Sequence, residues 1–440
     1  MNSTNPTNPT NPTNPTNPTN STNSTNSTNS IPILNLSRQY ETIRDEIDAA
    51  VLEVVRSGKY ILGPYVKAFE DAAASYCGVK HAIGVASGTD ALLLSLKALG
   101  IGPGDGVILP SFTFFATAGT VHNVGATPIF CDIDPKTFNL DPTHLRHILS
   151  TYPAHSTNPT NSTNPTNPMN PTNPTIRALI PVHLYGQMAE MGEILAIADD
   201  HGLKVIEDAA QAIGAEYRGA LSPNEPNEPY EPNEPVSSSR AGSLADCGCF
   251  SFYPTKNLGA YGDAGMITTH NDELAGTLRM LRVHGADPKY YHQKVGFNSR
   301  LDAIQAAILA VKLKHLDRWS ISRAQVADRY DALLRDVEGI VTPYRAADRS
   351  HIFHQYTIRV LDGKRDALRE HLRERGIGTM IYYPRPLHLQ ACFADLGYRE
   401  GELPESERAS REALSLPIFP ELLPEEIETV AHEIRAFVER

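Results

Sequence analysis

The sequence predicts an α/β protein, with a mainly parallel sheet in a large domain and a smaller C-terminal α+β domain. Short, almost wholly apolar segments typical of buried strands recur between residues 81 and 269. Helical segments lie between most of them, and strands that alternate with helices form parallel sheets covered on both faces. After about Trp319 the pattern changes to long helices, a few strands and scattered prolines, which indicates a second domain.

The expected elements follow one another from residue 41. The first is an amphipathic helix over 41–57, in which apolar residues recur at helical spacing from Ile43 to Val54. The last helix begins with Pro424, which suits the first helical position, and carries one apolar stripe. In full, we expect strands at 81–86, 106–109, 128–131, 178–182, 204–207, 249–252 and 266–269, and further helices at 90–99, 143–149, 302–313 and 424–439.

Three tracts of the chain show no apolar periodicity. The tracts 1–30 and 156–175 repeat Asn, Pro, Ser and Thr, and 222–235 is built on Pro-Asn-Glu. Such sequence cannot offset its ordering entropy by burying apolar surface, so we expect a disordered tail and two disordered insertions. Insertions in exposed loops cost little, because closure entropy rises slowly with loop length. The remaining sequence then divides into a large domain over 31–320 and a small domain over 321–440.

The bulk composition argues against several classes of function. A net charge of −12 with no basic block argues against a nucleic-acid partner. No segment approaches the ~20 apolar residues of a membrane span, and no secretion signal is visible, so we expect a cytoplasmic protein without a membrane partner. Cys247 and Cys249 are spaced for one face of a strand and not as a Cys-x-x-Cys pair. We therefore predict buried thiols and no metal site.

One lysine and one aspartate indicate the chemistry. The strand at 249–252 delivers Lys256 into a Gly-rich loop, and Asp208 follows the strand at 204–207. A lysine in a pocket can form a Schiff base with an aldehyde cofactor, and a carboxylate can keep a pyridine nitrogen protonated. We predict that Lys256 and Asp208 mark the two ends of a pyridoxal 5′-phosphate (PLP) site. Taken alone, Lys256 would more simply be explained as a surface lysine, and Asp208 as a helix-capping aspartate.

Further candidates surround this pair. Gly88 and Thr89 open an apolar helix after a strand, where free backbone amides and a hydroxyl suit a phosphate, although an ordinary N-cap has the same pattern. Ser251 could supply a second phosphate hydroxyl, and Gln211 could reach the phenolic oxygen of the ring. Phe114 could lie flat on the ring, although a phenylalanine in so apolar a segment is more often part of the core.

Seven segments between residues 87 and 390 resemble the DegT-type (DegT/DnrJ/StrS) sugar-nucleotide aminotransferases, and the likeness runs from about Ile33 to the C-terminus, interrupted only by the two internal tracts. The resemblance implies the fold type I architecture of PLP-dependent transferases, built as a homodimer with active sites shared between subunits. The segments are Ser-Gly-Thr-Asp-Ala-Leu (87–92), Pro-Ser-Phe-Thr-Phe (110–114), Pro-Val-His-Leu-Tyr-Gly (181–186), Glu-Asp-Ala-Ala-Gln (207–211), Phe-Ser-Phe-Tyr-Pro-Thr-Lys-Asn-Leu-Gly (250–259), Gly-Phe-Asn-Ser-Arg-Leu-Asp (296–302) and Tyr-Pro-Arg-Pro-Leu-His-Leu-Gln (383–390).

The resemblance assigns roles by position. Lys256 becomes the Schiff-base lysine and proton shuttle, and Asp208 the partner of the pyridine nitrogen. Phe114 matches the residue stacked on the ring, and Gln211 the one beside its phenolic oxygen. Asn298 matches an asparagine that reaches the phosphate from the other subunit. The phosphate contacts within one chain match Gly88, Thr89 and Ser251.

The implied reaction is ping-pong transamination, from an amino donor (glutamate by resemblance) to a keto group on a nucleotide-linked sugar. Such enzymes make amino sugars for surface polysaccharides or secondary metabolites. The sequence departs from the family pattern at two positions: Ala264 stands in the turn Gly-Asp-Ala-Gly where many members have a second glycine, and Tyr382 stands where some members have histidine. The change at Tyr382 leaves the identity of the substrate open, and no motif specifies the sugar, the nucleotide or the aminated carbon.

Three alternatives remain at this point. Another fold type I enzyme acting on an amino acid would clamp a carboxylate with arginine, and Arg300 and Arg385 are available. A PLP dehydratase of the same family has histidine in place of the lysine, so Lys256 argues against it. The last alternative is a non-catalytic regulatory relative.

Overall fold

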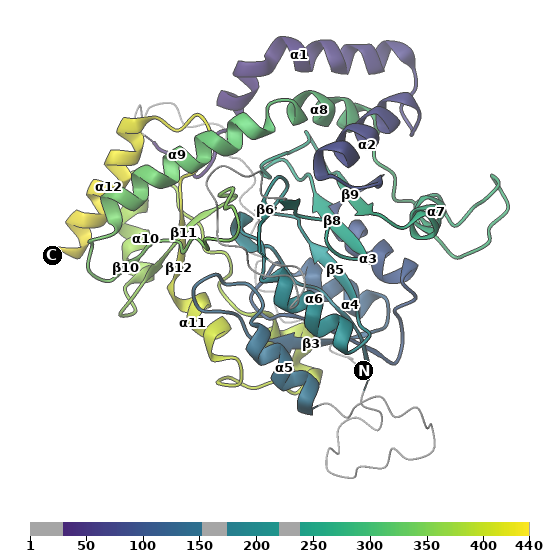
Figure 1. The fold of residues 1–440 in the computed structure, drawn as a ribbon. Helices are drawn as coiled ribbons and strands as arrows, with labels where there is room; N and C mark the ends of the chain where they lie inside the picture. Colours follow the sequence, from purple (N-terminus) through teal and green to yellow (C-terminus); the bar gives the residue numbers. More distant parts are fainter. Residues whose placement is uncertain (1–29, 152–173, 220–237, 440) are drawn as a thin grey trace, which may run out of the picture.

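The computed structural model describes residues 30–151, 174–219 and 238–439. A seven-stranded sheet lies at the centre of the larger part, in the order β1-β9-β8-β5-β4-β2-β3 (Figure 1). Only β9 runs antiparallel to its neighbours, so the expected mainly parallel sheet is confirmed. The strands are β1 (His81–Val85), β2 (Asp105–Pro110), β3 (Thr127–Cys131), β4 (Thr175–Leu179), β5 (Lys204–Asp208), β8 (Cys247–Ser251) and β9 (Gly265–Thr269); a two-stranded ribbon pairs β6 (Glu216–Tyr217) with β7 (Ser239–Arg240).

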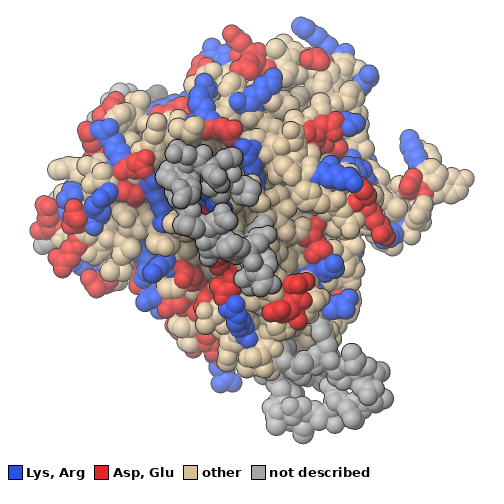
Figure 2. All heavy atoms as spheres, viewed as in Figure 1, with Lys and Arg blue, Asp and Glu red and all other residues tan. Residues whose placement is uncertain are grey.

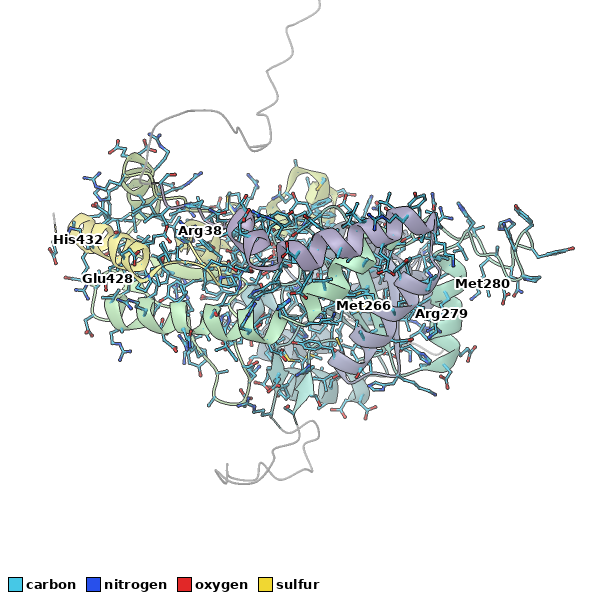
Figure 3. All side chains as sticks on the ribbon, turned by 90° about the horizontal axis from the view of Figure 1, so that it is seen from above. Arg38, Met266, Arg279, Met280, Glu428 and His432 are labelled. Atoms are coloured by element: carbon cyan, nitrogen blue, oxygen red, sulfur yellow. The ribbon has the colours of Figure 1, made fainter. Side chains whose placement is uncertain are left out.

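Helices cover both faces of this sheet, as a parallel sheet requires. One face packs against α2 (Pro64–Cys77), α5 (Pro142–Thr151), α6 (Met191–Asp200) and α8 (Ala303–Leu313). The other packs against α3 (Gly88–Ala98), α4 (Ala116–Asn123) and α7 (Asp272–Leu281). Seen from above, α1 (Leu36–Ser57) lies along α8, and the segment after Met280 projects at the end opposite Glu428 and His432 (Figure 3).

The C-terminal part has its own hydrophobic core around a three-stranded antiparallel sheet. This core also takes in Ile31, which pairs with Ile377 at the start of the described chain. The elements are α9 (Leu316–Leu334), β10 (Ile340–Val341), β11 (Tyr356–Val360), α10 (Arg365–Glu374), α11 (Pro404–Glu412), β12 (Ala413–Leu416) and α12 (Pro424–Val438); short 3₁₀ turns are η1 (Leu184–Gly186), η2 (Leu387–Leu389) and η3 (Ala391–Leu396).

Several boundaries differ from the sequence prediction. The strand expected at 178–182 is β4 and ends at Leu179, because Pro181 has no N–H to continue a central ladder. Thr175, which composition assigns to the tract 156–175, pairs with Asp105 as the first residue of β4. The first helix begins at Leu36 and not at residue 41, since the Asn35 side chain caps it by accepting from the Arg38 N–H at 3.1 Å. Nearly all of the three low-complexity tracts lie outside the described residues.

Acidic and basic side chains are interspersed over the face shown in Figure 2, with no continuous basic patch there. Within the described ranges, no helix combines the length and the apolar character needed to cross a membrane.

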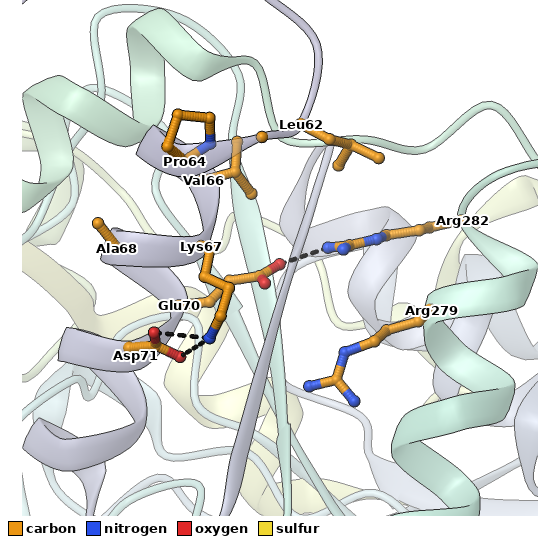
Figure 4. Close-up of a pocket in the computed structure, with 10 residues that line it drawn as sticks. Leu62, Pro64, Val66, Lys67, Ala68, Glu70, Asp71, Arg279 and Arg282 are labelled. Carbon is orange, nitrogen blue, oxygen red and sulfur yellow. Dashed lines mark hydrogen bonds and ion pairs between the residues drawn. The ribbon is translucent and has the colours of Figure 1, made fainter.

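A buried ion pair ties two helices to the edge strand β1. Arg282, after α7, pairs with Glu70 of α2, and both side chains are nearly buried. Glu70 also accepts the Gly84 N–H at 2.8 Å, and Arg282 donates to the Gly84 carbonyl at 2.8 Å. The pair borders an open cleft of about 670 Å³, with Arg279 on its rim (Figure 4).

We expect Arg282→Met to destabilise the fold by about 3–5 kcal/mol, because Glu70 would be left charged and buried without its partner. The melting temperature should fall by roughly 5–10 °C. The double variant Glu70→Gln/Arg282→Met should recover most of that loss, since the amide still accepts from Gly84. If Arg282→Met melts at the wild-type temperature, the prediction is wrong, and water must solvate the Glu70 carboxylate.

Candidate active site

The residues assigned to a cofactor site within one chain lie along one edge of the central sheet. Strands β1, β5 and β8 run parallel and end there, at Val85, Asp208 and Ser251. Strand β9 begins at the same edge, where Gly265 pairs with both Val85 and Ser251. In open α/β sheets, ligands bind outside the carboxyl ends of the strands, so this edge is the expected place for a cofactor.

Asp208 is buried and held by two hydrogen bonds. Thr117 donates its hydroxyl to Asp208 Oδ2 at 2.8 Å, and the Ala210 N–H donates to Oδ1 at 3.2 Å. The Thr117 hydroxyl in turn lies 3.2 Å from that of Thr113. Burial raises the pKa of the Asp208 carboxyl, while the two hydrogen bonds and the charge of Lys256 act to lower it. A cationic ring nitrogen beside this carboxylate would be strongly stabilised.

The neighbouring carboxylate, Glu207, makes structural hydrogen bonds on the other face of the sheet. Side chains alternate along a strand, so Glu207 points to the opposite face from Asp208. It accepts three backbone N–H groups between residues 242 and 245, at 2.8, 2.8 and 3.0 Å, and lies 2.9 Å from His183 Nε2. His183 Nδ1 accepts the Ala189 N–H at 3.1 Å, so the imidazole proton is on Nε2 and is donated to Glu207. Glu207 is thus fully engaged in holding the fold.

Lys256 lies in the loop between β8 and β9. Its backbone N–H donates to the Tyr253 carbonyl at 2.9 Å, and Phe252 closes the loop by bonding to both Ala260 and Ala264 at 2.8 Å. Burial lowers the pKa of the Lys256 amine to about 8, against the opposing charge of Asp208. A larger fraction of this amine is therefore unprotonated near neutral pH than in an ordinary lysine, as a nucleophile requires.

This pKa leads to an expected pH dependence for the cofactor-free protein. Only the unprotonated amine attacks an aldehyde, so the rate of PLP capture should rise about tenfold per unit well below pH 8 and level off above it. Asp208→Asn removes the charge that favours the ammonium, and should move the midpoint to lower pH. Stopped-flow absorbance measures the rate of capture. If the midpoint of its pH dependence lies near the ordinary pKa of a lysine, the lowered pKa of Lys256 is wrong.

The phosphate candidates meet at the start of α3. A Cβ on Gly88 would lie 2.6 Å from the Ser251 Cβ, so only glycine lets this turn approach the end of β8 so closely. Ser87 caps the helix by accepting the Asp90 N–H at 3.1 Å, which leaves the exposed Thr89 hydroxyl available. The first backbone N–H groups of α3 have no partner within the helix and suit an anion.

Gln211 and Phe114 are joined through a residue that sequence reasoning did not single out. Gln211 accepts the Tyr185 N–H at 2.7 Å and donates to the Tyr383 hydroxyl at 3.2 Å. The Tyr383 ring lies 6.2 Å from that of Phe114, centroid to centroid. Phe114 is 57% exposed, so it is not a core residue, and its ring is available for stacking.

Asn298 lies near the same edge of the sheet but is not bonded to the other candidates. It is exposed, after the projecting segment 284–295, and pairs with Val283. Among the described residues, no hydrogen bond or ion pair links its side chain to Lys256 or Ser251. The adjacent Ser299 accepts the Ala86 N–H at 3.4 Å, which places Asn298 near the end of its own β1.

Taken together, the residues present fit PLP. A glycine-lined turn and a helix N-terminus suit the phosphate, a buried carboxylate suits the ring nitrogen, and a lysine of lowered pKa suits the aldehyde. Thr113, Thr117 and Tyr383 were missed as members of this site, although Thr113 and Tyr383 stand inside quoted motifs. Thr117 follows Thr113 by one helical turn, which is the one sequence signal that could have found it.

Comparison with known proteins agrees with this geometry. Residues 41–435 match the model of the DegT/DnrJ/EryC1/StrS aminotransferase family. A relative from Geobacillus stearothermophilus, named a pleiotropic regulatory protein, is 50% identical over 92% of this chain and 98% of its own length. A dTDP-3-amino-3,4,6-trideoxy-alpha-D-glucose transaminase from Streptomyces venezuelae is 41% identical over 93% of this chain and 97% of its own.

Two solved structures extend the comparison. DesV from S. venezuelae, in complex with a ketimine intermediate, superposes with a TM-score of 0.81 at 41% identity, covering 94% of this chain and all of its own. NtdA from Bacillus subtilis, with bound cofactor PMP, superposes with a TM-score of 0.77 at 30% identity, covering 93% of this chain and 86% of its own. The chain therefore belongs to the DegT/DnrJ/EryC1/StrS aminotransferase family and is a PLP-dependent aminotransferase of fold type I.

Proposed function

We propose that this aminotransferase moves an amino group from glutamate to the keto group of a nucleotide-linked sugar, in the synthesis of amino sugars for polysaccharides or secondary metabolites. The observation that carries the chemistry is the Lys256 amine of lowered pKa, placed within electrostatic reach of the buried Asp208. Similarity to the dTDP-sugar transaminase of S. venezuelae supports the substrate class.

Bound PLP supplies an aldehyde that takes up amino groups and a ring that accepts electrons. Lys256 Nζ is proposed to hold the aldehyde at rest, to remove the proton from the donor's Cα, and later to return a proton to the sugar carbon. Because its pKa is lowered, this amine can both accept and donate a proton near neutral pH. Asp208, oriented by Thr117, is proposed to hold the ring nitrogen protonated, and Gln211 to orient the ring.

The phosphate is proposed to lie between the N-terminus of α3 and Ser251. Thr89 and Ser251 contribute hydroxyls there, and Gly88 keeps the space that a side chain would fill. Phe114 is proposed to stack on one face of the ring and shield it from water. Tyr383, bonded to Gln211, lies beside this face and is placed to contact the substrate.

The substrate class is tested by incubating the purified protein with PLP, glutamate and a panel of keto-sugar nucleotides. The panel should contain dTDP- and UDP-linked sugars with the keto group at C3 or at C4. Mass spectrometry should show one class gaining an amine while glutamate becomes 2-oxoglutarate. If glutamate is consumed only with small 2-oxo acids and no sugar is aminated, the substrate proposal fails although the chemistry stands.

We further propose that the enzyme is a cytoplasmic homodimer with shared active sites. Asn298 is exposed, and its side chain has no hydrogen bond to the described residues of its own chain. It follows a projecting segment with large exposed side chains. These are Tyr290, Tyr291 and Val295, at 78%, 71% and 93% exposure. Such a segment suits burial against a second copy, which would bring Asn298 towards the other subunit's phosphate.

Mixed dimers test this sharing. An inactive Lys256→Ala chain mixed with an impaired Asn298→Ala chain should form hybrids in which one site has both residues intact. An equal, fully exchanged mixture should recover up to about a quarter of wild-type activity, because half the dimers are hybrids with one intact site each. If Asn298→Ala alone is strongly impaired and the mixture recovers nothing, Asn298 serves its own subunit.

A second candidate function is regulation, favoured by the name of the Geobacillus stearothermophilus relative. Both functions can reside in one protein, so the discriminating observation is catalysis itself. A protein that holds PLP but aminates no compound in the panel would favour regulation.

A further inference from the structure

A buried histidine from the C-terminal part of the chain reaches the loop that carries Lys256. His354 lies two residues before β11 and is 6% exposed. Its Nδ1 is 3.1 Å from Oδ1 of Asn257, the residue after Lys256. Asn257 Nδ2 donates to the Ile352 carbonyl at 3.1 Å. The Asn257 side chain is thus joined twice to the segment 352–354.

These two bonds determine where the proton on the imidazole lies. The Ile352 carbonyl only accepts, so the amide nitrogen of Asn257 faces it and the amide oxygen faces His354. That oxygen also only accepts, so Nδ1 of His354 carries a proton. Burial lowers the pKa of His354 well below its ordinary value, and the charges of Lys256 and Arg323 lower it further. The ring is therefore neutral and does not repel the nearby lysine.

The segment that presents His354 is itself firmly held. The Ile352 N–H donates to the Gly186 carbonyl at 2.9 Å. Gly186 has φ +102°, and a Cβ there would lie 3.0 Å from the His354 backbone nitrogen, so the two segments touch without room for a side chain. From the other side, Arg323 of α9 donates to the Phe353 carbonyl at 3.1 Å. His354 therefore has a defined position relative to the central sheet.

The other end of the lysine loop is anchored separately. Lys312 of α8, 1% exposed, donates to the Gly259 carbonyl at 2.6 Å. Gly259 is thus held by α8, whereas the residue next to Lys256 is held from the C-terminal part of the chain, by the bonds of Asn257 to His354 and Ile352.

We propose that His354 is a positioning residue for Lys256, and that its Nδ1–H bond to Asn257 sets where the lysine amine stands relative to Asp208. This inference rests on the proposed role of Lys256. His354 would then affect the reaction through the position of Lys256, without touching the cofactor or the substrate.

The test compares variants that keep or lose this one hydrogen bond. His354→Leu loses this bond alone, and Asn257→Ala loses it together with the bond to the Ile352 carbonyl. His354→Asn places an amide N–H near the position of Nδ1. His351→Asn is the matched control, because His351 lies in the same turn and stacks on Phe353, with ring centroids 3.9 Å apart, without contacting the lysine loop.

We expect His354→Leu and Asn257→Ala each to slow PLP capture at pH 8 by about tenfold, the equivalent of one hydrogen bond. Capture is followed by stopped-flow absorbance, and borohydride reduction with mass spectrometry confirms attachment at Lys256. The catalytic constant kcat should fall in parallel while KM for the sugar stays within about twofold. His354→Asn should restore capture to within about threefold of wild type, and His351→Asn should match wild type. The double variant His354→Leu/Asn257→Ala should be no slower than Asn257→Ala alone, because that single variant has already lost the bond to His354.

If His354→Leu and His354→Asn slow capture equally, the imidazole only fills space and the inference is wrong. Capture within about twofold of wild type in both His354→Leu and Asn257→Ala would also overturn it. Circular dichroism and melting curves identify a variant that has not folded. If His354→Leu fails to fold, the comparison of His354→Asn with Asn257→Ala still tests whether a donor at position 354 is needed. A wild-type protein that captures no PLP would instead overturn the proposed role of Lys256, and this inference with it.

Discussion

Lys256→Ala should abolish turnover, with a loss of kcat of at least about 10²- to 10⁴-fold, because the variant has no amine to move protons at the reacting carbons. The same change should remove the visible absorbance of the bound cofactor, while far-ultraviolet circular dichroism stays as in wild type. Lys314→Ala, an exposed lysine at the end of α8, is the matched control and should behave as wild type. Residual turnover within tenfold of wild type would mean that another group carries the proton.

Asp208→Asn should lower kcat by about 10²-fold or more, because breaking a buried ion pair costs about 3–5 kcal/mol. The amide oxygen can still accept the Thr117 hydroxyl, although the bond from the Ala210 N–H and the charge opposite the ring nitrogen are lost. Cofactor retention, measured by equilibrium dialysis, should fall less than kcat.

Glu207→Gln is the matched control for Asp208→Asn. The amide replaces a carboxylate oxygen that accepts backbone N–H groups, so the melting temperature should fall. Turnover per folded molecule should stay near wild type. If Asp208→Asn turned over within about threefold of wild type, its assignment to the ring nitrogen would be wrong.

Much of the central sheet follows from local sequence. Apolar runs bounded by polar or Gly-rich segments located all seven strands, because a strand buried on both faces has no polar side to interrupt it. The positions of Lys256 and Asp208 could be predicted because Asp208 ends one such strand and Lys256 lies in the loop after another, and the parallel sheet brings both to one edge.

Other features depend on contacts between residues that are distant in sequence. The antiparallel direction of β9 is set by its fit between β1 and β8, and no local pattern encodes strand direction. His354 is nearly 100 residues from Asn257, and Tyr383 is farther still from Gln211. A single histidine or tyrosine has no periodicity to reveal its partner, so these contacts had to come from the structure.

The pairing of Ile31 with Ile377 has a consequence for how the chain is made. The Ile31 N–H donates to the Gly376 carbonyl at 2.9 Å, and the Gly378 N–H donates back to Ile31 at 2.8 Å. During synthesis, Ile31 leaves the ribosome roughly 350 residues before these partners. At about 5–20 residues per second, this is a delay on the order of tens of seconds. Throughout that interval Ile31 lacks its hydrogen-bond partners, so this part of the C-terminal core can form only after residues 376–378 have been synthesised.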